Sequence, residues 1–383
     1  MKVLYLWLIR FVSNLSRFKR KKLMIFFVSF DNNLDLIKAM AKKMPNKKHL
    51  IVFYEPSIEA AATDLAARGI RTIQFRNNLS FVFKYIPLVM QARVLFCDNY
   101  YAFLGGLAHP NSMKIVQLWH ANGAIKRFGW EDKATDKRSN ADKRRFQAVY
   151  DHFDDFVVAS EAMGQVFQNS YHIADNHIKL LGYPRSDRFL HETWIKRARN
   201  RVQRVAPELL GRRVIFYAPT YREGIKFELP DGIMDAFNAD PEAIVVIKLH
   251  PVLKQQEAQL RHYSNSRIKF YDQLSTADIL TVTDTLITDY SSVAFDFALL
   301  KNAKSIIFFM FDLPAYEQNP GIQTDLLAGL PTEPVQTVTG LTAAIKANST
   351  TDFTRFNETW NTYNDGLATG RVVDHYQKLL KKK

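Results

Sequence analysis

Two histidines stand where short apolar runs end, and each is followed by residues that break a strand. The first, His120, closes the run IVQLWH at residues 115–120 and is followed by Ala-Asn-Gly. An imidazole can accept a proton near neutral pH, and the small residues after it leave space for another molecule to approach the ring. His120 is therefore a candidate general base. A histidine satisfied by hydrogen bonds inside the protein is the alternative.

The second histidine lies in the segment IKLHP, which contains Lys248, His250 and Pro251. Proline stops a strand and forces a turn, so the imidazole of His250 is expected to project from the end of the strand. An imidazole at that position can donate a hydrogen bond to a phosphate oxygen. We interpret His250 as a second catalytic candidate and Lys248 as a substrate-binding one. A turn histidine bonded to the backbone is the alternative.

The segment LITDYSSVAFDFALL combines an apolar strand with the start of a helix. The strand ends at Asp289, and Ser291 or Ser292 can cap a helix that begins near Val293. Such a helix start presents free N–H groups to a phosphate. The chain has no Gly-rich Walker or dinucleotide fingerprint, so phosphate binding has to come from a device of this kind together with cationic side chains. An ordinary N-cap explains Ser291 equally well.

Two further segments place cations and hydroxyls at turns. In LGYPRSDRF, Pro184 stiffens a turn, Arg185 offers a planar fork to a diphosphate, and Asp187 can orient that arginine or bind a ribose hydroxyl. In YAPTYREG, Thr220 and Arg222 follow a strand and can contact phosphate or acceptor. A surface salt bridge is the alternative for Arg185 and Asp187.

Short apolar, β-branched or aromatic runs alternate with stretches of helical period, and this alternation predicts parallel sheets covered by helices on both faces. We therefore expect two doubly wound α/β domains with a cleft between them. The expected strands are residues 24–30, 50–55, 94–98, 115–120 and 156–160 in the first half, and 214–220, 243–251, 267–271, 285–292 and 305–310 in the second.

Polar side chains gather at the carboxyl ends of these expected strands, which is the edge at which open α/β sheets bind ligands. They are Asp31, Glu55, Asp98, His120, Glu161, Thr220, His250 and Asp289. The candidate residues are thus expected at one kind of position, although they are spread over the chain.

Length and composition fit two domains. A chain of 383 residues with 47% hydrophobic residues is too long for one ordinary core and can bury two. We expect a separate basic segment at 1–22 and domains at 23–190 and 191–383, with a charged helical stretch at 191–213 leading into the second. The single Cys97 excludes an internal disulfide framework and a Cys-rich zinc site.

The net charge of +14 indicates anionic partners, namely nucleic acid, phosphorylated small molecules or an acidic membrane surface. The N-terminal run MKVLYLWLIRFVSNLSRFKRKK is too short and too charged to span a bilayer, and its basic cluster lies on the wrong side for a signal peptide. Its helical period of apolar residues is typical of a helix lying in the plane of an anionic membrane. The residues concerned are Leu4, Trp7, Leu8, Phe11, Leu15 and Phe18. A first helix packed on the core is the alternative.

Taken in order, the segments WHANGAIKRFG, GYPRSD, YAPTYRE, KLHP and TDYSSVAFDF resemble the CDP-glycerol glycerophosphotransferase family of wall teichoic acid synthesis. The resemblance covers most of residues 95–325, and FDLPAYEQNPG is similar to a later segment of that family. The length is more similar to the priming members than to the longer polymerases. Many polymerase members carry WHG-T-P-L-K where this chain has WHANGAIK, so the loop expected to face the acceptor, with Asn122 and Lys126, differs from theirs.

The resemblance implies a GT-B-like arrangement of two Rossmann-like domains, with the acceptor on the N-terminal side and the nucleotide mainly in the C-terminal half. It implies transfer of glycerol phosphate from CDP-glycerol to a hydroxyl of an undecaprenyl-diphosphate-linked disaccharide (ManNAc-GlcNAc), with release of CMP. His120 would act as the base, and Arg185, His250 and the helix start at Ser291 and Ser292 would hold the diphosphate. No cofactor is required and no metal site is implied, while Mg²⁺ bound to the diphosphate is compatible with the reaction.

The same resemblance implies peripheral attachment to the cytoplasmic face of the cell membrane, with other teichoic acid enzymes as potential partners. One alternative is a related transferase that extends a poly(glycerol phosphate) chain or uses another CDP-polyol. A basic membrane- or nucleic-acid-binding protein without catalysis would explain the charge. It would not explain histidines, serines and an Arg-Asp pair at successive strand ends, so no nucleic-acid partner is expected.

Overall fold

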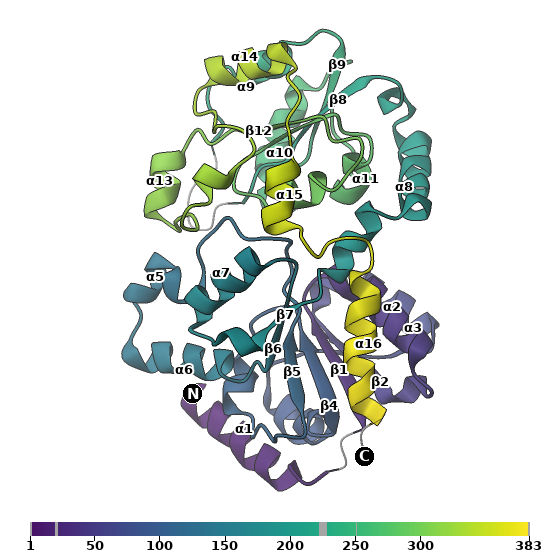
Figure 1. Cartoon of the computed structure of the whole chain (residues 1–383), viewed down its shortest axis with the longest axis vertical. Helices are drawn as coiled ribbons and strands as arrows, with labels where there is room; N and C mark the ends of the chain where they lie inside the picture. The colour runs from purple at the N-terminus through teal and green to yellow at the C-terminus, as the bar shows by residue number, and fades with distance from the viewer. Residues whose placement is uncertain (1, 20–21, 222–227, 250, 382–383) are drawn as a thin grey trace. The chain divides into compact units, whose positions relative to one another are not determined.

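The computed structural model describes residues 2–19, 22–221, 228–249 and 251–381 (Figure 1). By its internal contacts the chain divides into two compact units. Unit 1 comprises Met1–Ala121, Phe128–Asp187 and Thr362–Lys383, and unit 2 comprises Asn122–Arg127 and Arg188–Asn361. The polypeptide thus passes from unit 1 to unit 2 more than once.

Unit 1 is built on a seven-stranded sheet in which neighbouring strands run parallel, in the order β3-β2-β1-β4-β5-β6-β7. All six residues of β1 are buried, as expected for a strand covered on both faces. The strands are β1 (Leu23–Val28), β2 (Leu50–Tyr54), β3 (Arg71–Gln74), β4 (Ala92–Cys97), β5 (Lys114–Gln117), β6 (Asp155–Val158) and β7 (Ile178–Leu180).

Helices connect these strands and cover the sheet. Those of unit 1 are α1 (Lys2–Ser16), α2 (Leu34–Lys43), α3 (Glu59–Ala67), α4 (Ile86–Val89), α5 (Lys133–Asp136), α6 (Asn140–Tyr150), α7 (Glu161–Tyr171) and α16 (Ala368–Lys381).

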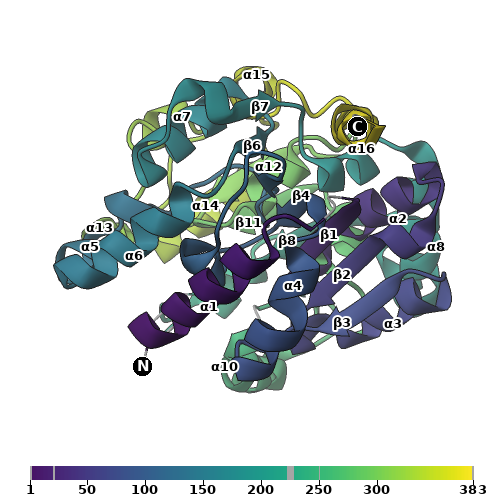
Figure 2. The ribbon, with the colours of Figure 1, turned by 90° about the horizontal axis from the view of Figure 1, so that it is seen from below.

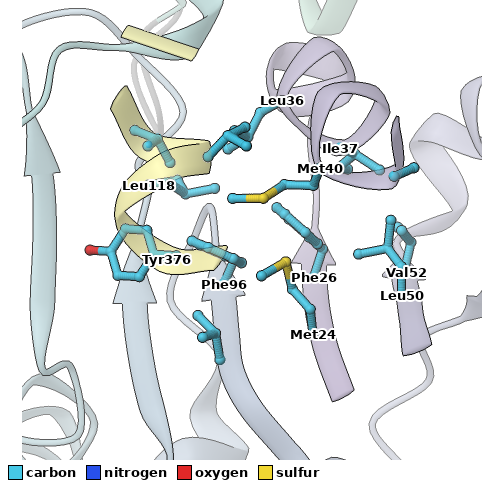
Figure 3. Close-up of a cluster of buried hydrophobic side chains, with 14 of the residues drawn as sticks. Met24, Phe26, Leu36, Ile37, Met40, Leu50, Val52, Phe96, Leu118 and Tyr376 are labelled. Atoms are coloured by element: carbon cyan, nitrogen blue, oxygen red, sulfur yellow. The ribbon is translucent and has the colours of Figure 1, made fainter. Parts of the chain in front are cut away.

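One face of the sheet is covered by α2 and the C-terminal helix α16 (Figure 3). Phe26 of β1 and Phe96 of β4 pack with Met40 of α2 and Tyr376 of α16, and all four side chains are buried. The Tyr376 hydroxyl donates to the buried Asp155 carboxylate at 3.1 Å. The last helix of the chain is therefore part of the first core.

This placement of α16 differs from the expected division, which assigned residues 191–383 to one domain. Thr362–Lys383 instead belongs to unit 1. The physical reason is the apolar stripe of α16, in which Val372, Val373 and Tyr376 fill the space between α2 and the strands.

The opposite face of the sheet carries a cluster of aromatic rings. Phe27 of β1 stacks on Phe53 of β2 with ring centroids 4.6 Å apart, and it contacts Phe81 and Phe103 at 6.1 and 4.9 Å. Because side chains alternate across a strand, Phe26 and Phe27 point to opposite faces. The segments that carry Phe81 and Phe103 are also those against which α1 packs.

Helix α1 packs on the rest of unit 1 by one narrow face. It lies beside α4 (Figure 2). Ile9 and Val12 are buried on that face. The rest of the helix exposes large apolar side chains, namely Val3, Leu4, Trp7, Phe11 and Leu15. The helix is therefore packed on the core and amphipathic at once. Over the described residues, no helix combines the length and apolar character needed to cross a membrane.

Unit 2 is a second parallel sheet, with five strands in the order β10-β9-β8-β11-β12. The strands are β8 (Arg213–Tyr217), β9 (Ala243–Ile247), β10 (Ile268–Lys269), β11 (Thr285–Thr288) and β12 (Ser305–Phe308). The helices are α8 (Glu192–Val205), α9 (Ile233–Phe237), α10 (Lys254–Leu260), α11 (Thr276–Leu280), α12 (Val293–Phe297), α13 (Leu313–Gln318), α14 (Val338–Ala347) and α15 (Thr354–Trp360).

The two parallel sheets confirm the predicted α/β class with two Rossmann-like units. Each of the ten expected runs contains a strand, whereas β3 and β7 were not anticipated. Both missed strands lie at sheet edges, and their residues are mostly half-buried. A half-buried edge strand lacks the continuous apolar run by which the other strands are recognised. The cleft expected between the domains stays a prediction.

Candidate active site

His120 lies at the carboxyl edge of the unit 1 sheet, shortly after β5 ends at Gln117. Its Nδ1 is 3.0 Å from the backbone carbonyl oxygen of Asp98, the residue that follows β4. A carbonyl oxygen can only accept a hydrogen bond, so Nδ1 carries the proton of the neutral ring and Nε2 keeps its lone pair. The neutral imidazole is thus in the tautomer that can accept a proton through Nε2.

The turn before His120 has a strained backbone. Trp119 has a φ of 58°, in the left-handed region that a bulky side chain disfavours. Its N–H donates to the Gln117 side chain at 2.8 Å, and its carbonyl accepts from Asn33 Nδ2 at 3.4 Å. Strain maintained by such contacts is characteristic of functional turns.

Both the backbone and the ring of His120 are fixed by neighbours. The His120 carbonyl accepts from Arg185 Nη1 at 2.9 Å and from Asn32 Nδ2 at 2.5 Å. The imidazole stacks on Phe30 with centroids 4.7 Å apart, and the Trp119 ring lies 4.3 Å away on centroids. The direction of Nε2 is therefore set before any substrate binds.

Asp98 supports the residues around His120 through hydrogen bonds. Its fully buried carboxylate accepts from the N–H groups of Ser29 and Phe30 at 2.9 to 3.1 Å and from the Tyr101 hydroxyl at 3.2 Å. Burial raises the pKa of Asp98 to about 7, and the hydrogen bonds from Ser29, Phe30 and Tyr101 oppose this rise. Asp98 thus holds the loop that carries Phe30 while its own carbonyl holds His120. Asp98 was expected at the end of a strand, but no role was predicted for it from the sequence.

The environment also keeps His120 neutral. Burial lowers the pKa of His120 to about 4, the positive charge of Arg185 acts in the same direction, and the hydrogen bond to Asp98 opposes both. A ring with this pKa is almost entirely unprotonated at pH 7. The free imidazole is therefore available as a proton acceptor across the physiological range.

Arg185 and Asp187 make contacts within unit 1 that were not expected, and their predicted substrate contacts stay predictions. Arg185 was expected to grip a diphosphate, and in the structure one of its terminal nitrogens donates to the His120 carbonyl. Asp187 was expected to orient Arg185 or bind ribose. Its carboxylate instead accepts from the N–H groups of Ala368 and Thr369 at 3.0 and 2.7 Å and so caps α16. A buried carboxylate used in this way serves the fold.

Residues Asn122–Arg127, expected as an acceptor-facing loop, form part of unit 2. Asn122 is fully buried and donates from Nδ2 to Asn361 Oδ1 at 3.0 Å. Lys126 has an exposed side chain, and its backbone pairs with Ile322 in an antiparallel bridge. The amide of Asn122 is thus engaged inside unit 2, and its expected substrate contact stays a prediction.

Glycine is required within this segment. Gly123 has a φ of 68°, and a Cβ there would come within 2.6 Å of the Phe295 ring. Nearby, the Gln323 N–H donates to the Ile125 carbonyl at 2.8 Å, and the Arg127 N–H donates to the Gly321 carbonyl at 3.0 Å. The motifs WHANGAIK and YEQNPG, far apart in sequence, thus meet along one stretch of backbone.

The carboxyl edge of the unit 2 sheet brings together four candidate residues. The buried Asp289 carboxylate accepts from the Thr220 N–H at 2.7 Å and from the Tyr290 N–H at 2.6 Å, and so ties the end of β8 to the end of β11. Ser291 Oγ accepts from the Val293 N–H at 3.3 Å just before α12, whereas the residue at the N-cap position, Ser292, makes no side-chain cap hydrogen bond. Ser291 and Ser292 are half-buried beside this edge.

Lys248 follows β9, the neighbour of β8, and its Nζ donates to the Tyr271 carbonyl at 3.3 Å. Two other candidates, Arg222 and His250, lie outside the described residues. Within the described ranges no group of three or more His, Cys, Asp or Glu side chains is placed to hold a metal ion. The compatibility with Mg²⁺ stays a prediction.

Two Rossmann-like parallel sheets, each with polar groups at its carboxyl edge, define a GT-B-like class of protein. A solved structure of the wall teichoic acid polymerase TagF has this fold. It superposes with a TM-score of 0.69 over 97% of this chain and 93% of that one, at 19% sequence identity.

Proteins related in sequence identify the family of this chain. A teichoic acid glycerol-phosphate primase of Bacillus subtilis strain 168 is 29% identical over 359 residues, covering 92% of this chain and 91% of the relative. One from Bacillus spizizenii is 33% identical over 294 residues, covering 75% and 74%. Residues 9–377 match the family of CDP-glycerol:poly(glycerophosphate) glycerophosphotransferases. The chain belongs to that family and is a transferase of teichoic acid synthesis, which confirms the resemblance read from its motifs.

Proposed function

We propose that this transferase moves glycerol phosphate from CDP-glycerol to a hydroxyl of an undecaprenyl-diphosphate-linked disaccharide, ManNAc-GlcNAc, as the priming step of wall teichoic acid synthesis. The observation that carries the proposal is the state of His120 in a chain of this family. Its ring is neutral, in the Nδ1–H tautomer and fixed in direction.

In the proposed reaction the acceptor hydroxyl oxygen attacks the β-phosphorus of CDP-glycerol. A new phosphorus–oxygen bond forms, the bond to the CMP oxygen breaks, and CMP leaves with its electron pair. His120 Nε2 accepts the proton of the attacking hydroxyl. General-base assistance of this kind contributes about 10²- to 10⁴-fold to a rate.

Unit 2 is proposed to bind the nucleotide at the carboxyl edge of its sheet. Ser291 and Ser292 would donate hydroxyl hydrogen bonds to the diphosphate, with the Thr220 side chain beside them. Lys248, Arg222 and His250 would add cationic or ring N–H donors. Donors of this kind stabilise charge that develops on the phosphoryl oxygens and the leaving group. The described contacts support a structural role for Asp289, which holds the loops that carry these donors.

We propose roles for Arg185 and Asp187 that differ from the substrate contacts expected from the sequence. Because Arg185 donates to the carbonyl of His120, we assign it to positioning the base, with its charge helping to keep the ring neutral. Asp187 is assigned to the cap of α16.

Helix α1 is proposed to attach the enzyme to the cytoplasmic face of the membrane, where a lipid-linked acceptor lies. Trp7 and Phe11 stack on each other with centroids 5.8 Å apart, and they are 59% and 51% exposed. The Tyr5 hydroxyl donates to the Asn78 carbonyl at 3.5 Å, next to a segment that exposes Leu79 and Phe83. The cations Arg17, Lys19 and Lys22, which follow α1 in the sequence, suit anionic headgroups, each contributing about 1 kcal/mol near the surface.

Vesicle sedimentation tests this attachment. Trp7→Ala combined with Phe11→Ala should lower binding to vesicles containing anionic lipid by about tenfold or more. The reason is that the variant lacks the two rings whose apolar surface would be buried in the membrane. Leu367→Ala is the matched control, since Leu367 is 63% exposed elsewhere in unit 1. Equal binding of the double variant and the control would remove α1 as the anchor.

The function itself is tested with purified enzyme and radiolabelled CDP-glycerol. Two acceptors are compared: the disaccharide lipid, and the same lipid already bearing one glycerol phosphate. Transfer to the first supports the priming reaction, and transfer to the second alone supports chain extension. Competition by a second CDP-polyol tests the donor. Transfer to neither acceptor by folded enzyme would leave the non-catalytic alternative, a basic membrane- or nucleic-acid-binding protein.

A further inference from the structure

Unit 1 contains a small open pocket that has no role in the reaction proposed above. It has a volume of about 50 Å³ and lies among the segment at residues 129–132, α5 and α6. That volume holds about four water-sized atoms, which is about the size of one phosphate group. Its principal lining residues are Trp130, Asp132, Arg138, Lys143, Phe146 and Tyr150.

The lining combines cations with aromatic rings. The Arg138 guanidinium lies over the Phe146 ring, 4.5 Å from its centroid. Lys143 Nζ makes a long 3.4 Å contact to the Asp136 carbonyl. The lining carboxylate, Asp132, accepts from the Ala134 N–H at 2.9 Å as the cap of α5. Two cations and one carboxylate therefore line the pocket, and the Phe146 ring packs against one of the cations.

A continuous row of aromatic rings joins this pocket to His120. The Trp119 ring lies 4.3 Å from His120 and 4.8 Å from Phe128 on centroids. Phe128 lies 5.4 Å from Tyr171, which stacks on the pocket residue Tyr150 at 3.9 Å. Because all these residues belong to unit 1, the base and the pocket are held in one rigid core.

The pocket is also close to the exposed helix α1. The Lys2 charge acts on Asp142 in the first turn of α6, and Figures 1 and 2 show the beginning of α1 beside α6. Both α1 and α6 pack on residues 102–106. The helix α6 that lines the pocket is therefore a neighbour of the beginning of α1, and the row of rings links the same pocket to His120.

We propose that this pocket binds one phosphate of the diphosphate that links the acceptor saccharide to its lipid. The inference rests on the proposed function, which supplies a lipid-linked acceptor. Arg138 and Lys143 bind the phosphate oxygens, while the lipid tail extends toward α1 and the saccharide toward His120. The donor nucleotide also carries a diphosphate, and the location in unit 1 next to α1 favours the acceptor as its source.

The test compares a double variant, Arg138→Ala with Lys143→Ala, with a matched control, Lys137→Ala with Arg144→Ala. Both remove two cations from the same stretch of exposed or half-exposed residues, but Lys137 and Arg144 do not line the pocket. Calorimetric titration of full-length protein measures three ligands: a farnesyl-diphosphate-linked disaccharide, the same disaccharide on an uncharged alkyl chain, and CDP-glycerol.

We expect the double variant to weaken binding of the diphosphate-linked disaccharide about tenfold or more, since two charge-assisted hydrogen bonds are lost. Binding of CDP-glycerol and of the uncharged analogue should stay within about twofold, and the control should bind all three ligands as the unsubstituted protein does. An unchanged affinity for the diphosphate-linked disaccharide overturns the proposal. An effect confined to CDP-glycerol also overturns it, because the pocket would then serve the donor.

Turnover is measured separately on the same proteins. Charge-dependent binding of the analogue without transfer to it would contradict the proposed function and leave the pocket assignment standing. Transfer with an acceptor KM that is equal in the double variant and the control would contradict the pocket assignment and leave the function standing.

Discussion

The carboxyl edges of the two sheets present different chemical groups. In unit 1 the edge holds one imidazole among Phe30, Trp119 and a buried carboxylate, and burial keeps the ring neutral. In unit 2 the edge consists of hydroxyls and backbone N–H groups around Ser291 and Thr220, tied together by Asp289. The neutral, fixed ring keeps a lone pair free for a proton although its lowered pKa makes it a weak base, whereas serine hydroxyls can donate to an anion. The comparison indicates that one chain can use the same edge of the same fold for two kinds of chemistry.

The largest test of this division is His120→Ala. Removal of the base should lower kcat by about 100-fold or more, while the affinity for CDP-glycerol measured by titration stays within about twofold. His177→Ala is a suitable control, because the Nδ1 of His177 also lies near a backbone carbonyl, that of Phe153 at 3.1 Å. A near-normal kcat for His120→Ala would show that His120 is not the general base.

Asp98→Asn tests the support beneath His120. The amide retains only one acceptor oxygen for the N–H groups of Ser29 and Phe30, so the free energy of unfolding should fall by about 1–3 kcal/mol. The folded fraction should also lose about tenfold in kcat, because Phe30 no longer fixes the ring. Asp155→Asn is the comparison, since it also alters a buried carboxylate of unit 1. Equal kcat values for the two variants would show that Asp98 serves stability alone.

The two titrations in unit 1 give opposite pH dependences. Asp98 is raised from 3.8 to about 7, so the stability it contributes is complete below pH 3.8 and is lost as pH rises toward 7. His120 is lowered from 6.5 to about 4, so its contribution is lost as pH falls from 6.5 toward 4. Urea unfolding between pH 4 and 8 should show each slope disappear in the corresponding variant. The acid limb of kcat/KM should lie nearer pH 4 than 6.5, and a limb at 6.5 would contradict a base whose pKa is lowered.

The smallest effect is expected in unit 2. Ser291→Ala removes one hydroxyl from the proposed diphosphate site and should raise the Kd for CDP-glycerol about 3- to 10-fold, with little change in the acceptor KM. Ser264→Ala is a control, because its hydroxyl donates to the Ile268 carbonyl at 3.1 Å elsewhere in unit 2. A change in acceptor KM without a change in donor affinity would reverse the roles of the two edges.

The fold was largely readable from the sequence because buried parallel strands are continuous apolar runs. Ten such runs became strands, and their carboxyl ends carry His120, Thr220 and Asp289 as expected. The edge strands β3 and β7 were missed because half-buried residues give no such run. The site was only partly readable. The sequence predicted His120 after a strand and serines at the start of a helix, but it could not show that Arg185 donates to a carbonyl or that Asp187 caps a distant helix.

By itself, the sequence determined the local elements, the motif order that identifies the family, the basic charge and the apolar period of α1. These follow from residue type and spacing, which act over a few residues. Tertiary structure alone decided that α16 completes the first core, that Asn122–Arg127 joins the second, and that Asp98 and Phe30 fix the tautomer and direction of His120. Those outcomes depend on contacts between segments that are 22 to several hundred residues apart in the chain, and only packing of the folded core brings them together.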